Sequence, residues 1–219
     1  MPSADAIVAK IERLVRDKLR DESTGHDWWH ADRVRTTAIR IAAMEGVDPF
    51  VVELAALLHD VDDYKFSGDE EAGPRFAHSC LTSTGVSLDV ADHVAEIIRW
   101  MSFKGANVEL PVLSAEGKCV QDADRLDAMG AIGIARTFAY GGFVNRPIHD
   151  PDVSPVMHAS ADAYINSKGT TINHFHEKLL LLRERMNTDF GRKLAEERHR
   201  YMVDFLERFR AEWSGHAVC

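Results

Sequence analysis

The chain has little of what marks secreted and membrane proteins. Its three cysteines, Cys80, Cys119 and Cys219, are few, odd in number and widely spaced. This pattern argues against a disulfide framework or a cysteine-based zinc motif and favours a reducing compartment. No apolar run approaches the length of a membrane span, and the polar first residues lack the apolar region of a signal peptide. We therefore expect a cytoplasmic protein with no membrane partner.

Positive charge is also scarce. Lysine and arginine number 26 against 35 aspartates and glutamates, and the formal net charge is −9 at pH 7. Because proteins that bind extended nucleic acid present a basic face to the phosphates, this balance disfavours such a partner. A small phosphorylated ligand stays compatible with it, since a bound metal ion can invert the local field.

Alternating patterns typical of strands are missing, and so are repeats and the Rossmann and P-loop motifs. Apolar residues instead recur at helical spacing along most of the chain, and 45% of its residues are hydrophobic. We predict an all-α fold, a compact multi-helix bundle forming one domain over residues 1–219, with C-terminal helices at 171–213 packed on a catalytic core. The expected helices cover about residues 4–19, 28–44, 49–59, 75–83, 88–101, 115–134, 171–186 and 189–213, with a surface loop at 67–74 and a loop-rich excursion at 141–169.

An apolar run at residues 51–58 leads directly into His59-Asp60-Val61-Asp62-Asp63. About one His-Asp dipeptide is expected by chance in a chain of this composition, and three occur, beginning at His26, His59 and His149. Only the one at His59 follows an apolar helical run. Burying such groups without partners costs several kcal/mol, so either they are exposed to solvent by accident or a cation satisfies them.

Three aspartates, Asp122, Asp124 and Asp127, lie in an otherwise apolar helical segment, although aspartate is a poor residue for helix interiors. Asp124 and Asp127 would share a face, and a solvated face with Arg125 as partner is the simpler alternative. Imidazoles and carboxylates without a thiolate suit Mn²⁺, Fe²⁺, Co²⁺, Ni²⁺ or Zn²⁺, and Mg²⁺ less well. An ion held by two histidines and two aspartates would keep positions free for water and a substrate oxygen.

Several ordered segments carry a family resemblance. Around the histidines and aspartates the chain resembles the HD superfamily of metal-dependent phosphohydrolases, in particular its small single-domain bacterial members, over about residues 20 to 205. The matching segments are His26-Asp27-Trp28-Trp29-His30, Leu57-Leu58-His59-Asp60-Val61-Asp62-Asp63, Ser102-Phe103-Lys104, Gln121-Asp122-Ala123-Asp124-Arg125-Leu126-Asp127-Ala128, and a C-terminal stretch from His174 to Thr188.

The resemblance implies roles for individual residues. Asp63, which acts with Asp60 in catalysis, would position or deprotonate the attacking water. Related enzymes often have Glu-Asp at this point, where the chain has Asp62-Asp63. The implied metal ligands are His30, His59, Asp60 and Asp124, and the implied contacts to substrate are His26, Lys65, His93, Lys104 and Arg125.

The family also implies an activity. The expected reaction is hydrolysis of a phosphoester or phosphoanhydride bond in a phosphorylated small molecule, with a nucleotide favoured, by a protein that could form a homodimer. One divalent metal ion (Mn, Mg, Fe, Co, Ni or Zn, with Mn favoured) would activate the water.

Three other interpretations compete with this one. The first is a catalytically slow regulatory protein that binds a nucleotide or a metal. The second is a zinc protease, because His26 and His30 have the H-x-x-x-H spacing, although Asp27 stands where such proteases use glutamate. The third is a helical scaffold without a site, which would leave three separate clusters of acidic and imidazole groups to chance.

Overall fold

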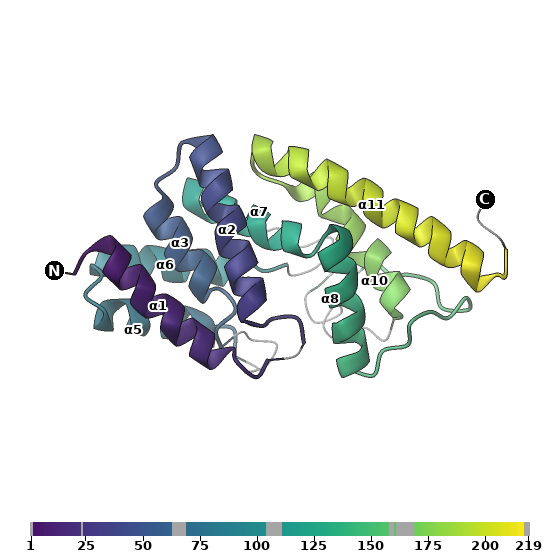
Figure 1. Cartoon of the computed structure of the whole chain (residues 1–219), viewed down its shortest axis with the longest axis horizontal. Helices are drawn as coiled ribbons and strands as arrows, with labels where there is room; N and C mark the ends of the chain where they lie inside the picture. The colour runs from purple at the N-terminus through teal and green to yellow at the C-terminus, as the bar shows by residue number, and fades with distance from the viewer. Residues whose placement is uncertain are drawn as a thin grey trace. The chain divides into compact units, whose positions relative to one another are not determined.

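The computed structural model describes residues 2–22, 24–62, 69–103, 111–157, 160 and 169–216. Every regular element in these ranges is a helix (Figure 1), which confirms the predicted all-α class. Across the same ranges, no helix has both the length and the apolar character needed to cross a membrane.

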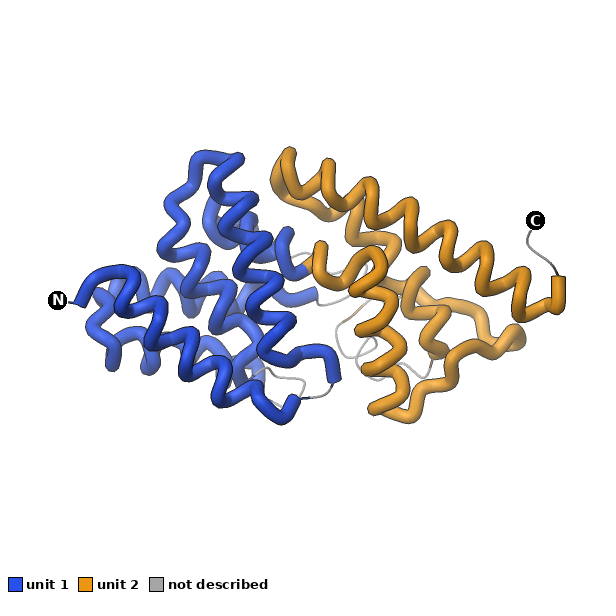
Figure 2. The backbone as a smooth tube through the Cα atoms, in the orientation of Figure 1, with its two compact units in different colours: residues 1–103, 110–124 blue, residues 104–109, 125–219 orange. Residues whose placement is uncertain are grey.

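The packing of the chain defines two compact units (Figure 2). Unit 1 comprises residues 1–103 and 110–124, and unit 2 comprises residues 104–109 and 125–219. Helix α7 (Ala115–Asp127) contributes to both, because the boundary falls between Asp124 and Arg125. A single domain over residues 1–219, with the C-terminal helices on a catalytic core, stays a prediction.

Unit 1 is built around the apolar helix α3 (Pro49–Leu58), which packs against three of its neighbours, α1, α2 and α6. Its core positions, Val52 and residues 54–58, are fully buried. Local signals set the helix starts, since Ser3, Asp27 and Asp48 each accept a backbone hydrogen bond as N-caps. The other helices of unit 1 are α1 (Ala4–Lys18), α2 (Trp28–Glu45), α5 (Ala72–Ser83) and α6 (Leu88–Met101).

Unit 2 contains two longer helices that pack together, α8 (Gly130–Phe143) and α11 (Asp189–Trp213), with the short helix α10 (Thr171–Glu177) against α8. Phe138 of α8 makes ring contacts with Phe175 of α10 and Phe205 of α11. Two 3₁₀ turns, Leu179–Leu181 and Arg183–Arg185, connect α10 to α11. The predicted cap of the last helix is confirmed, because Thr188 accepts a hydrogen bond from Gly191.

The prediction of a continuous helix through residue 134 is wrong. Helix α7 ends at Asp127 and α8 begins at Gly130, whose φ of 68° lies in the left-handed region that favours glycine. Arg198 of α11 donates from Nη1 to the Leu126 carbonyl at 2.5 Å. A carbonyl near the helix end is thereby satisfied by a side chain 72 residues away.

Two further boundaries differ from prediction. The expected helix at 171–186 stops at Glu177 and continues as 3₁₀ turns, in which Leu179 and Leu182, three residues apart, are both buried. Helix α5 begins at Ala72, inside the predicted surface loop, because Gly73 and Pro74 are buried in its first turn. Proline is tolerated there, since its missing N–H would have no partner within the helix.

Candidate metal centre

The end of α3 brings His59 and Asp60 to the edge of the core. The helix ends at Leu58, His59 keeps helical backbone angles, and the backbone N–H of Val61 donates to the Leu58 carbonyl. His59 and Asp60 are only 6% and 8% exposed. The apolar run that precedes them therefore places two ionisable side chains in a buried position, as the sequence predicts.

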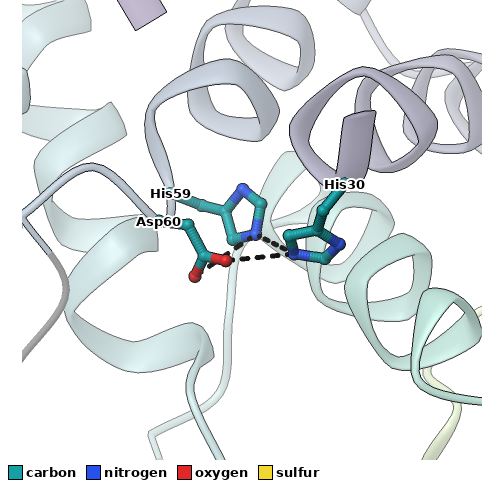
Figure 3. Close-up of side chains that lie close together, drawn as sticks. All are labelled: His30, His59 and Asp60. Carbon is teal, nitrogen blue, oxygen red and sulfur yellow. Dashed lines mark hydrogen bonds and ion pairs between the residues drawn. The ribbon is translucent and has the colours of Figure 1, made fainter. Parts of the chain in front are cut away.

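His30 reaches the same place from the first turn of α2. The carboxylate of Asp27 caps this helix and accepts a hydrogen bond from the backbone N–H of His30 at 2.9 Å. The His30 side chain is 1% exposed and points toward His59 and Asp60 (Figure 3). In the dipeptide His26-Asp27, Asp27 thus has a structural role as a helix cap.

The three side chains converge on one point. The Nε2 atoms of His30 and His59 lie 3.1 Å apart, and Asp60 Oδ2 lies 3.1 Å from His30 Nε2 (Figure 3). Asp60 Oδ1 is 3.6 Å from His59 Nε2. One ligand atom from each residue can be chosen so that all lie within 4.8 Å of one another.

Asp124 of α7 adds a second carboxylate. Its Oδ1 is 3.5 Å from His30 Nε2 and 3.9 Å from His59 Nε2, and its side chain is 33% exposed. Asp127 instead pairs with Arg136 at 3.1 Å, and Asp122 is fully buried. Tertiary packing therefore distinguishes three aspartates that lie within six residues of one another in the sequence.

These spacings suit one divalent ion. Ligand atoms bound to one ion at about 2.1 Å lie about 3 Å apart at octahedral angles and about 3.4 Å apart at tetrahedral angles. The observed separations, from 3.1 to 3.9 Å, lie within about half an ångström of these values. The four side chains present two imidazole nitrogens and carboxylate oxygens, a donor set that accepts several divalent ions.

A hydrogen bond selects the tautomer of His59. Its Nδ1 lies 2.8 Å from the carbonyl oxygen of Ala56, which can only accept, so Nδ1 carries the proton. The neutral ring then has its lone pair on Nε2, which faces His30. Hydrogen bonds of this kind orient metal-binding histidines.

The charge of Asp60 also fits a cation site. Burial raises the pKa of Asp60, but its electrostatic interactions with the imidazoles of His59, His26 and His30, and a side-chain hydrogen bond with His30, outweigh burial and hold that pKa well below its ordinary value. Asp60 Oδ2 is buried, and in the described part of the chain it lies 3.1 Å from His30 Nε2. An ionised, buried carboxylate of this kind is expected to bind a cation.

His26 lies beside the cluster but precedes α2, so the shared helical face considered for His26 and His30 does not form. Its ring meets the His30 ring edge to face, with centroids 5.8 Å apart. Its Nδ1 lies 3.1 Å from the hydroxyl oxygen of Thr24. From this position His26 could contact a molecule bound at the cluster.

The other predicted site residues either contact residues outside the cluster or lie outside the described residues. His93 on α6 contacts Ser114 Oγ at 3.1 Å and Glu116 Oε2 at 3.4 Å. Arg125 donates from its guanidinium to the Arg185 carbonyl. Asp63, Lys65 and Lys104 lie outside the described residues.

Two features of the site do not follow from sequence patterns. The first is the hydrogen bond between His59 and the Ala56 carbonyl, for which the only sequence signal is that Ala56 stands three residues before His59 in a helical segment. Lys18, at the end of α1, pairs with Asp62 at 3.2 Å, and no spacing rule relates two residues 44 positions apart.

Comparison with known proteins identifies a family. The family model that describes the HD domain matches residues 28–129 of this chain. YpgQ of Bacillus subtilis (strain 168) is 41% identical over 208 residues, which cover 94% of this chain and 93% of YpgQ.

Solved structures agree along nearly the whole chain. A protein from Lactobacillus plantarum superposes with a TM-score of 0.87 at 36% identity, covering 98% of this chain and 100% of that protein. An HD-superfamily hydrolase from Bacillus thuringiensis has a TM-score of 0.74 at 41% identity, with 97% and 99% covered. YpgQ in complex with ADP has a TM-score of 0.73 at 37% identity, with 95% and 96% covered.

Proposed function

This chain belongs to the HD superfamily, and we propose on that basis that it is a metal-dependent phosphohydrolase acting on a phosphorylated small molecule, specifically a nucleotide. The observation that carries the proposal is the convergence of two imidazole nitrogens and two carboxylates at separations that suit one ion. His30, His59, Asp60 and Asp124 are its proposed ligands.

Each ligand contributes in a different way. His59, held by the Ala56 carbonyl, presents the lone pair of Nε2, and His30 faces it from the capped start of α2. Asp60 supplies a buried negative charge. Asp124 is 33% exposed, so the cluster meets solvent on the side of this carboxylate.

When bound, a divalent ion would lower the pKa of a water molecule and polarise a phosphoryl oxygen. Mn²⁺ is our favoured ion, since it accepts both imidazole and carboxylate ligands. We propose that Asp63 takes the proton from the attacking water and that Asp60 also acts in catalysis. Both assignments rest on the family resemblance.

The nucleotide part of the proposal draws on YpgQ, which has been solved with ADP. Phosphate groups need cationic or donor partners near the metal. His26 is the described candidate that lies beside the cluster. Lys65, His93, Lys104 and Arg125 complete the proposed set of substrate contacts.

Release of phosphate and pyrophosphate from a panel of nucleoside mono-, di- and triphosphates tests the proposal. Metal-stripped protein would be assayed with Mn²⁺, Mg²⁺, Co²⁺, Ni²⁺ or Zn²⁺ added singly. We expect turnover that requires a metal and that is lost in His59→Ala. His78→Ala is the matched control, since His78 lies on α5 and pairs with Asp92.

The product identifies the bond that is cleaved, because triphosphates yield either phosphate or pyrophosphate. Metal binding without turnover on any nucleotide would contradict the hydrolase proposal and leave the regulatory binding role. Turnover that survives both His59→Ala and metal removal would contradict the metal centre itself.

A further inference from the structure

The chain leaves the metal cluster through a turn in an uncommon conformation. Asp62, two residues after Asp60, has a φ of 58°, in the left-handed region that residues other than glycine seldom adopt. Asparagine and aspartate tolerate this region better than most residues, but it is still less favourable than the ordinary helical or extended backbone. The turn therefore needs support from its surroundings.

Lys18 supplies one such support from the last turn of α1. Its Nζ lies 3.2 Å from Asp62 Oδ1 and 3.3 Å from Oδ2, so the ammonium group contacts both carboxylate oxygens. The same Nζ lies 4.2 Å from the centroid of the Phe76 ring on α5. A contact with an aromatic face holds a lysine head more closely than a simple surface ion pair does.

Helix α5 encloses the turn from a second direction. A Cβ placed on Gly73 would come within 3.3 Å of the Val61 carbonyl oxygen and 3.7 Å of the Asp62 carbonyl oxygen. The backbone of α5 therefore packs directly on the turn. Val61 is 1% exposed, so the segment between Asp60 and Asp62 is held on its inner side as well.

We propose that Lys18 is a positioning residue for the metal centre: its pair with Asp62 holds the left-handed turn and thereby keeps the Asp60 carboxylate aimed at His30 and His59. The inference rests on the proposed function, because it assumes that the cluster binds a divalent ion. Neither Lys18 nor Asp62 needs to touch the ion or the substrate.

The direction in which metal affinity changes when Lys18 is replaced distinguishes a positioning role from a simple charge effect. Removing a lysine near a cation site removes repulsion and should strengthen metal binding. Loss of positioning should weaken it, as substitutions among the residues that orient metal ligands do. The pair is about 40% exposed on both sides, so we expect a loss at the lower end, about 5- to 10-fold.

Glycine at position 62 offers a sharper test, since it adopts positive φ without a side-chain support. Mn²⁺ and Co²⁺ affinities would be measured by calorimetry for wild type, Lys18→Met, Asp62→Gly and the double variant, together with the visible spectrum of the Co²⁺ form. We expect Lys18→Met to weaken binding and alter the spectrum, and to do neither when added to Asp62→Gly. Lys18→Arg should restore most of the affinity.

Lys10→Met is the matched control, because Lys10 is an exposed lysine on the same helix. Metal affinities of the two variants are compared at a temperature at which both stay folded. The positioning role is overturned if Lys18→Met leaves metal affinity unchanged or raises it. It is also overturned if Lys18→Met weakens affinity equally in the wild-type and Asp62→Gly backgrounds. In each case the hydrolase proposal stands. If wild type binds neither ion, the metal centre and the proposed function fail first.

Discussion

His30 lies on α2 and His59 directly follows α3, and their Nε2 atoms lie 3.1 Å apart in a buried position. The neutral His59 ring carries its proton on Nδ1, which donates a hydrogen bond to the Ala56 carbonyl. Two imidazole lone pairs facing each other in a dry environment would repel, so the pair is stable only with a proton or a cation between the rings. The proposed metal ion would be such a cation.

The tautomer of His59 can be observed directly. We expect ¹⁵N spectra of the metal-free protein to show that the neutral His59 ring carries its proton on Nδ1 and not on Nε2, because the carbonyl partner only accepts. A diamagnetic ion such as Zn²⁺ should then shift the Nε2 resonance and leave Nδ1 protonated. A proton on Nε2 with a bare Nδ1 would contradict the assignment.

Asp124 and Asp127 give a matched pair of substitutions on one helix. Asp124→Asn should reduce metal affinity at least about 10-fold, since it replaces a carboxylate that lies 3.5 Å from His30 Nε2. Asp127→Asn should leave affinity nearly unchanged but destabilise the protein by about 3 kcal/mol, because it removes the buried negative charge that pairs with Arg136. Calorimetric metal titration and urea unfolding measure the two effects, and equal metal affinities would contradict the ligand assignment.

Gly133 and Gly142 of α8 are predicted to respond oppositely to alanine. A Cβ on Gly133 would lie 2.3 Å from the carbonyl carbon and oxygen of Ala128, which are backbone atoms and cannot turn away. Gly133→Ala should therefore destabilise by about 3 kcal/mol.

A Cβ on Gly142 meets nothing within 4 Å. Gly142→Ala should stabilise by about 0.5 kcal/mol, because alanine loses less backbone entropy on folding into a helix. Urea unfolding of both variants checks the pair, and a stable Gly133→Ala protein would show that the Ala128 backbone is not where the structure places it.

The thiol of Cys119 predicts a pH dependence of stability. Burial raises its pKa to about 11, and the carboxylates of Asp122, Glu45 and Glu116 act in the same direction. The unfolded thiol titrates near pH 9, so the unfolded state loses its proton first as pH rises. The stabilising contribution is thus complete below about pH 9 and is lost as pH rises toward 11, an effect of about 2 kcal/mol.

Comparison with Cys119→Ala isolates this contribution. The difference in unfolding free energy between wild type and Cys119→Ala should shrink by about 2 kcal/mol from pH 8 to pH 11. Val120→Ala, also fully buried on α7, provides the control, since its difference from wild type should stay constant. A constant difference for Cys119→Ala as well would show that this thiol titrates normally.

Much of the fold could be predicted because its signals are local. Asp48 and Pro49 start α3, and Gly46 ends α2 with a left-handed φ of 71°, as the sequence pattern indicates. The helix break after Asp127 could not be predicted in this way. It depends on the hydrogen bond from Arg198 to the Leu126 carbonyl, which joins two segments far apart in the chain.

The sequence by itself determined the all-α class, most helix starts and the residue types of the candidate site, because caps, helical periodicity and an apolar run ending in His-Asp act within a few residues. Only the tertiary structure decided that Asp124 joins His30 and His59 while Asp127 turns to Arg136, and that Lys18 supports the turn at Asp62. Those contacts join segments far apart in the chain. Their geometry is set by how buried helices pack, and local spacing carries no information about it.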